Sequence, residues 1–274
     1  AFFFSEIGAG LYLVSLFFEF WRGCLVGWLL SAILGGGLHL LYLGRPERAW
    51  RAILRPAKSE LSRGLIIMGL FLGLGAIQIA PSLGPLRVLP WEGDMLFLKI
   101  AMITLSFFMI THGFMTMNVM SAVAFWNSAI LPVLSLASGL WLGSQLGMVA
   151  GAAFSEGGIF IAMEPLARWS LFAYAFLIIV YLWNSAHSSS TVKESLRVIV
   201  KGDLARFFYI GVVLIGLIVP LAVSLKYWVN GVDSSQGFVY LRFLCAFIGD
   251  LALRYVITKS GRYTPLIYTN LVRG

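Results

Sequence analysis

Long, uninterrupted apolar segments dominate this chain of 274 residues and restrict its possible folds more than any other feature. About 20 apolar residues are needed to cross a bilayer as a helix. Backbone groups inside lipid must also bond within the segment or within a closed barrel. The segments do not alternate in polarity as barrel strands do. The sequence therefore predicts an all-α integral membrane protein of about eight transmembrane helices, at 2–21, 24–43, 63–80, 95–117, 121–147, 166–186, 205–225 and 237–257.

Composition supports a membrane protein and excludes several classes of function. Only 12% of the residues are charged and the mean hydropathy is +0.89, whereas a soluble domain carries about 25% charged residues. The net charge of +8 comes from basic residues in short loops, which is how membrane proteins fix their orientation. We therefore expect membrane lipid around the protein and no nucleic-acid partner.

The supply of metal ligands is small. Cys24 and Cys245 lie in different segments, and an iron–sulfur cluster needs four ligands. The three histidines all lie near one face of the membrane, so they would hold at most one haem. We expect no haem, no iron–sulfur cluster and no other metal in this chain.

The eight segments place both termini on one face, which we call side A. Side A holds the loops 44–62, 118–120 and 187–204 and the tail from Thr258, and side B is the opposite face. Side A carries thirteen basic residues against six on side B, so the positive-inside rule predicts that side A is cytoplasmic in a cell (inner) membrane. The nine tryptophans are expected at the two membrane interfaces: Trp21, Trp28, Trp50, Trp91, Trp126, Trp141, Trp169, Trp183 and Trp228.

We predict two four-helix bundles. The first covers residues 1–120 and includes the basic loop 44–62, and the second covers residues 121–274. An amphipathic helix near 190–202 carries an apolar stripe of Val192, Leu196 and Ile199, and it is expected at the membrane surface or against a partner subunit. Glycines 139, 143, 147 and 151 recur every four residues, a spacing that lets helices pack closely.

Ionisable residues inside the membrane are costly, so each is a candidate functional residue. Glu6, His39 and His112 all lie towards side A, while the rest of the membrane region looks poor in such groups. Asp250 and Arg254 are four residues apart in the eighth segment and are expected to form either a proton relay or a structural ion pair.

The most unusual sequence follows His39. It reads Leu-Leu-Tyr42-Leu-Gly44-Arg45-Pro46-Glu-Arg48-Ala-Trp50-Arg51, continues through Arg55-Pro56, and reaches Ser62-Arg63-Gly64 at the start of the next helix. This pattern resembles the NrfD-like family, the polysulfide reductase membrane subunits, which carry a histidine, an LGRP motif and a serine–arginine–glycine. Weaker matches in the same order are residues 6–10, Phe125–Pro132, Gly249–Tyr255 and Gly261.

The resemblance implies a cofactor-free helical subunit of two four-helix bundles that anchors a ferredoxin-like iron–sulfur subunit. That partner is usually joined to a molybdenum- or tungsten-pterin catalytic subunit, and quinone (menaquinone or ubiquinone) is the exchangeable ligand. Glu6, His39 and His112 are then the expected proton-exchanging residues, with Tyr42 and Arg45 also near the quinone. Tyr42-Leu43 stands where the family often has an acidic residue. Partner docking is assigned to Arg48, Arg51, Arg55 and Arg63.

Two alternative functions stay open. The first is a proton-conducting or purely anchoring subunit of the same kind of complex, in which Glu6, Asp250 and Arg254 form a proton relay or a structural ion-pair network. The second is a secondary transporter. A transporter favours inverted repeats and broken helices at mid-membrane, and no persuasive repeat is visible.

Overall fold

The computed structural model describes residues 1–83, 96–230 and 236–264, and within these ranges the regular structure is entirely helical. In chain order the helices are α1 (Phe2–Phe17), α2 (Trp21–Leu30), α3 (Gly37–Tyr42), α4 (Glu60–Ile79), α5 (Leu96–Asn118), α6 (Ile130–Ala153), α7 (Gly157–Ala186), α8 (Ser190–Val200), α9 (Val219–Asn230) and α10 (Gln236–Ser260). Two π-helical stretches, η1 (Ser31–Gly36) and η5 (Phe207–Ile218), continue α2 into α3 and lead into α9. Short 3-10 helices occur at η2 (Pro46–Leu54) and η3 (Ala80–Ser82).

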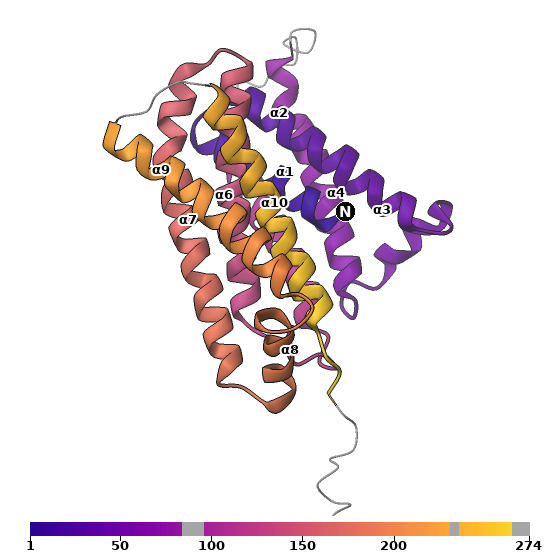
Figure 1. Ribbon diagram of the computed structural model, residues 1–274. Coiled ribbons are helices and arrows are strands. Elements are labelled where there is room, and N and C mark those ends of the chain that lie inside the picture. The colour runs from indigo at the N-terminus through magenta and orange to yellow at the C-terminus, as the bar shows by residue number, and fades with distance from the viewer. Residues whose placement is uncertain (84–95, 231–235, 265–274) are drawn as a thin grey trace, which may run out of the picture.

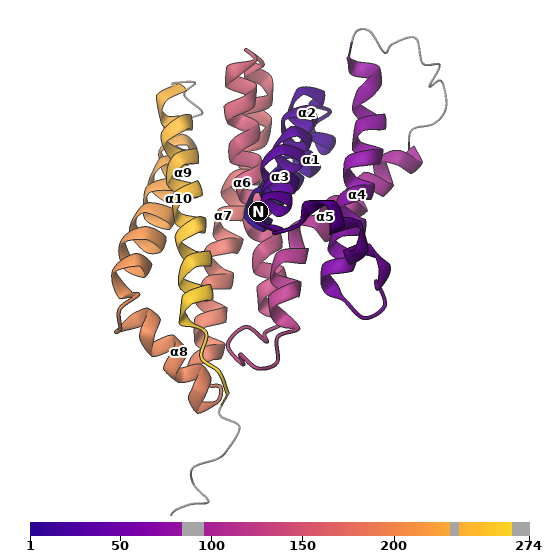
Figure 2. The same cartoon turned by 90° about the vertical axis from the view of Figure 1, so that its right-hand side faces the viewer.

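The long helices run side by side (Figures 1 and 2), as expected of a multi-pass membrane protein. Among the described residues, six helical segments are long and apolar enough to cross a membrane, while α1 is apolar but shorter, at 16 residues. The all-helical prediction is confirmed. The count of eight spans and the division into two four-helix bundles remain predictions.

Glycines let α1 lie at the centre of this packing. A Cβ on Gly10 would lie 2.1 Å from the carbonyl oxygen of Gly139 on α6, and one on Gly27 of α2 would lie 2.5 Å from the carbonyl oxygen of Gly8. No side chain fits at such distances, so the helix backbones meet directly. The predicted packing role of the glycine row on α6 is confirmed, because Gly143 likewise meets the backbone of Gly10.

Several predicted boundaries differ from the structure, most of all the starts of the fifth and sixth segments. The fifth segment does not begin at 121, because residues 119–129 form a compact turn tied to its neighbours: Trp126 Nε1 donates to Ile257 O at 2.9 Å and Tyr181 Oη donates to Phe125 O at 2.8 Å. The sixth begins at Gly157 rather than 166, with Pro165 inside the helix. Membrane helices tolerate such a proline because neighbouring groups satisfy the freed carbonyl.

The amphipathic helix is α8, at one end of the bundle beside α7 and α10 (Figures 1 and 2). Val192 and Ile199 are buried, whereas Lys193 and Arg197 are exposed, so its predicted two faces are confirmed. The interfacial placement of the tryptophans was wrong for Trp141, whose side chain is fully buried in the core. Arg87, Trp91 and Arg273 lie outside the described residues.

Candidate functional site

A buried carboxylate on α1 joins three helices. Glu6 is only 1% exposed. Its Oε2 lies 2.7 Å from Nη1 of Arg254 on α10 and accepts a hydrogen bond from Oγ of Ser135 on α6 at 3.2 Å. The charge that the sequence places inside the membrane is therefore paired, as a buried charge has to be.

Arg254 is held by a second carboxylate. Its Nε donates to Oδ2 of Asp250 at 2.8 Å, one helical turn away on α10. The other oxygen of Asp250 accepts from Oη of Tyr174 on α7 at 2.7 Å. We call Glu6, Ser135, Tyr174, Asp250 and Arg254 the Glu6 cluster. Two carboxylates share one guanidinium, so the cluster carries one negative charge when all three groups are ionised.

The second oxygen of Glu6 has no partner among the described residues. Oε1 is buried and accepts no hydrogen bond from them. Glu6 lines a cavity of about 260 Å³ whose walls include Phe2, Phe3 and Phe114. Gly113 also lines this cavity, and a Cβ there would lie 2.1 Å from Oε1. Any larger residue at position 113 would displace the carboxylate oxygen of Glu6.

The two predicted histidines contact the Phe2 ring. The ring centroid of Phe2 is 4.6 Å from that of His39 and 5.8 Å from that of His112. Both histidines line a smaller cavity of about 20 Å³. A Cβ on Gly64, which closes the serine–arginine–glycine motif, would lie 1.9 Å from Nε2 of His112. That glycine makes room for the imidazole.

Glu6 and His39 therefore line separate cavities, and Phe2 lines both. The Nδ1 of His39 lies 2.8 Å from the carbonyl oxygen of Gly35, within its own helix. Thr116 lines the larger cavity and contacts His112, because its Oγ1 donates to the carbonyl oxygen of His112 at 3.0 Å and lies 3.4 Å from Nε2 of the same residue.

The arginine-rich connector is largely solvent-exposed. Tyr42 is 92% exposed, and neither Tyr42 nor Arg45 lines the two cavities. Arg48, Arg51 and Arg55 are also exposed. Their roles in binding quinone or a partner stay predictions.

Arg63 is also exposed, but its hydrogen bonds are to residues of the connector and the start of α4. Its Nε donates to Pro56 O at 2.8 Å, its Nη2 donates to Ala57 O at 3.2 Å, and it pairs with Glu60. Ser62 donates to Ala52 O. The serine and arginine of the motif thus close the loop that returns the chain to α4.

A second buried charge cluster lies towards side B and was missed from the sequence. The side chain of Arg242 on α10 is fully buried, and its Nη1 lies 3.6 Å from Oε1 of Glu164 on α7. Arg168 Nη1 lies 3.6 Å from Oε2 of Glu164. The Gln145 amide is oriented with its oxygen towards the neighbouring donors. This oxygen accepts from Arg242 Nε at 2.8 Å and from Trp141 Nε1 at 3.3 Å. We call Gln145, Glu164, Arg168 and Arg242 the Arg242 cluster.

The expectation that polar groups gather at one end of the membrane region was therefore wrong. Starting the sixth helix at 166 placed Glu164 in a loop, and Arg242 was counted as an orientation charge on side B. The available signal was the spacing of Glu164 and Arg168, which puts them on one face of a helix once Pro165 is allowed inside it.

Comparison with known proteins identifies the family of this chain. The family described as "Polysulphide reductase, NrfD" matches residues 1–265. The protein is also similar to the C subunit of polysulfide reductase from Wolinella succinogenes, with 29% identity over 155 residues. That alignment covers 55% of this protein and 48% of the relative, so the match spans about half the length of the relative.

Proposed function

The chain belongs to the NrfD polysulphide reductase family, and from this membership we propose that it is the membrane-anchoring, quinone-interacting subunit of a multi-subunit respiratory oxidoreductase. It passes electrons between the quinone pool and a ferredoxin-like iron–sulfur subunit, which serves a molybdenum- or tungsten-pterin catalytic subunit. One observation carries the proposal: Glu6, whose buried Oε1 has no hydrogen-bond partner among the described residues, lines an aromatic-walled cavity of about 260 Å³.

The larger cavity fits the head group of a quinol. Aromatic side chains suit a flat apolar ring, and a few placed polar groups fix its orientation. Oε1 of Glu6 is an acceptor for one quinol hydroxyl, and Oγ1 of Thr116 is a polar contact for the other. The small cavity between the histidines has room for a water-sized group only, at about 20 Å³.

Oxidation of the quinol to the quinone releases two electrons and two protons. The electrons leave to the iron–sulfur cluster of the partner. One hydroxyl proton passes to Glu6, and the other passes through Thr116 to His112. Glu6 acts as a general base, and His112 and His39 take protons on towards side A. In the reductive direction the same groups return two protons to the quinone.

Arg254 and Asp250 are positioning residues in this scheme. Asp250 fixes the guanidinium of Arg254, and Arg254 in turn holds Oε2 of Glu6. These contacts fix the orientation of the Glu6 carboxylate at the wall of the cavity. Such fixed geometry is what makes a bound group react efficiently.

The connector supplies the docking surface. Arg45, Arg48, Arg51 and Arg55 are exposed within one short segment next to the helix that carries His39. A dense positive patch favours an acidic partner surface and speeds its encounter. We place the iron–sulfur subunit on this patch, with side A as the cytoplasmic face.

The substitution Glu6→Gln tests the proposal. Gln keeps an acceptor for Ser135 and leaves Arg254 paired with Asp250, but it cannot take a proton. Quinone-linked turnover should fall about 100-fold or more, the usual contribution of a general base, whereas dye-linked activity of the catalytic subunit stays at the level of the parent complex. His39→Ala should lower the same rate.

Glu156→Gln is the matched control, because Glu156 forms an ion pair with Arg22 at 3.0 Å that is partly exposed on side B. It should leave both activities unchanged. A quinone-linked rate in the Glu6→Gln complex equal to that of the control would reject Glu6 as the base. Failure of a quinone analogue to inhibit the complex would instead favour a purely anchoring subunit.

A second function, proton conduction across the membrane, is favoured by the two clusters together. Trp141 connects them: its ring centroid lies 5.0 Å from that of Tyr174 in the Glu6 cluster, and its Nε1 lies 3.3 Å from the Gln145 oxygen in the Arg242 cluster. Asp250 and Arg242 are about 12 Å apart along α10 at 1.5 Å per residue. Buried polar groups thus follow each other from side A towards side B.

Glu164→Gln separates the two functions. If the column conducts protons, this variant lowers the number of protons moved per electron in proteoliposomes, while quinone-linked turnover measured with an uncoupler stays unchanged. An unchanged proton yield would restrict the Arg242 cluster to a structural role.

A further inference from the structure

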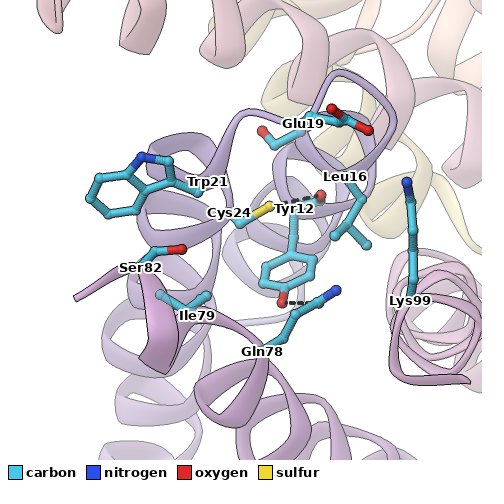
Figure 3. A pocket seen from close by; sticks show the side chains of 10 residues that line it. Tyr12, Leu16, Glu19, Trp21, Cys24, Gln78, Ile79, Ser82 and Lys99 are labelled. Atoms are coloured by element: carbon cyan, nitrogen blue, oxygen red, sulfur yellow. Dashed lines mark hydrogen bonds between the residues drawn. The ribbon is translucent and has the colours of Figure 1, made fainter. Parts of the chain in front are cut away.

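A third cavity, of about 190 Å³, lies at side B between the ends of α1, α2, α4 and α5. Figure 3 shows its lining, which combines the apolar side chains of Leu16 and Ile79 with Gln78, Glu19 and Lys99. None of these residues belongs to the Glu6 or Arg242 clusters. The cavity is therefore a separate site.

Hydrogen-bonding groups in this cavity are left available. Tyr12 Oη donates to Oε1 of Gln78 at 2.6 Å (Figure 3). This bond uses the amide oxygen, and the NH₂ group has no acceptor among the described residues. Ser15 also lines the cavity, is fully buried, and its Oγ has no hydrogen-bond partner in the described part of the protein. The Ser15 hydroxyl is a buried donor without an acceptor, which is unfavourable, and the amide of half-buried Gln78 is a second available donor. The cavity therefore suits a ligand with acceptor atoms.

Two side chains of opposite charge, Lys99 and Glu19, lie at the rim of the cavity. Each has the same sign as the helix dipole at its own position. Lys99 lies in the first turn of α5, where the helix dipole is positive, and Glu19 follows the last turn of α1, where it is negative. No ion pair that includes either residue occurs within the described residues. Each dipole adds to its side chain, so the cavity has one positive edge and one negative edge.

We propose that this cavity binds the zwitterionic head group of a phosphoethanolamine lipid. The phosphate accepts hydrogen bonds from Lys99, Gln78 and Ser15, and the primary ammonium donates to the carboxylate of Glu19. A trimethylammonium group has no N–H to donate, and a glycerol head group has no positive charge for Glu19. Phosphatidylethanolamine is thereby distinguished from phosphatidylcholine and phosphatidylglycerol.

The position of the cavity assigns the ligand to the bilayer. It lies at the helix ends beside Trp21, which is 38% exposed, and aromatic rings of this kind prefer the head-group level. Towards the membrane interior, Ile77 on α4 and Ile100 on α5 expose apolar side chains. These provide the surface along which acyl chains lie.

The test measures binding of short-chain phosphatidylethanolamine, phosphatidylcholine and phosphatidylglycerol to the purified detergent-solubilised protein by native mass spectrometry and thermal shift. Phosphatidylethanolamine should bind about tenfold more tightly than the other two, which corresponds to one charge-assisted hydrogen bond. Free phosphoethanolamine should bind much more weakly than the lipid. Equal binding of the three lipids, or equal binding of the free head group, would overturn the proposal.

Variants locate the site. Glu19→Gln should abolish the preference for phosphatidylethanolamine over phosphatidylglycerol, and Lys99→Gln should weaken all three lipids about tenfold. Gln78→Glu keeps an acceptor for Tyr12 while repelling phosphate, so it should also weaken all three. Lys193→Gln on α8 is the matched control and should change nothing. A lipid preference that survives Glu19→Gln in folded protein would reject the site.

Discussion

The Glu6 cluster and the Arg242 cluster are both buried, yet they differ in charge, distance and surroundings. The Glu6 cluster has two carboxylates and one arginine with contacts of 2.7 and 2.8 Å. The Arg242 cluster has one carboxylate and two arginines, with ion-pair distances of 3.6 Å. Each cluster keeps one carboxylate oxygen without a hydrogen bond from the described residues, but Glu6 lines a cavity, whereas Glu164 pairs with two arginines. A tight negative cluster beside a cavity suits proton uptake from a ligand, and a looser positive one suits a structural or relay role.

The largest expected difference follows removal of the central arginine. Arg254→Gln leaves Glu6 and Asp250 buried without a cation, and breaking a buried pair in this way costs about 3–5 kcal/mol. Arg242→Gln should cost less, because Glu164 keeps Arg168. The free energy of unfolding in mixed micelles measures both. A greater loss for Arg242→Gln than for Arg254→Gln would reverse the ranking of the clusters.

Alanine substitutions at two glycines test whether each region can accommodate an added Cβ. Gly113→Ala places a Cβ 2.1 Å from Glu6 Oε1, and displacing a reacting group by about 1 Å costs on the order of 100-fold in rate. Gly147→Ala meets the flexible end of Met163, with Sδ at 2.5 Å, so that side chain can move away. Quinone-linked turnover should fall in the first variant only. Equal turnover in both would show that the position of Oε1 is not critical.

The smallest expected effect concerns two buried tyrosines. Tyr174→Phe removes a hydrogen bond to the carboxylate of Asp250, worth about 1.5–3 kcal/mol. Tyr181→Phe removes one to the carbonyl of Phe125, worth about 0.5–1.5 kcal/mol. Thermal unfolding of the purified proteins separates the two. If Tyr181→Phe were the more destabilising, the hydrogen bond from Tyr174 to Asp250 would contribute little to stability.

The helical fold was predictable because each span is a long apolar segment, and the side-A candidates were predictable because ionisable residues interrupt those segments. Hydropathy alone does not show which surface a side chain faces. It placed Glu6 and His39 at one end of the bundle, but it did not show that they line separate cavities.

Other features depend on contacts between distant residues. Trp141 looked interfacial, but its burial depends on Tyr174 and Gln145 in the folded bundle. The link of Gly64 to His112 joins α4 to α5 and has no local signal. Arg63 belongs to a motif that suggested docking, while its hydrogen bonds to Pro56 and Ala57 brace the loop.

The ion pair between Glu6 and Arg254 also bears on the order of biogenesis. The ribosome delivers α1 to the membrane long before α10, and proteins acquire structure as they emerge. Until Arg254 arrives, Glu6 has no cation in the bilayer, and α1 meets α6 through bare backbone at Gly10 and Gly139. Insertion of α10 therefore supplies the cation for a helix made much earlier, so a polypeptide interrupted before residue 254 lacks the ion-pair partner of Glu6.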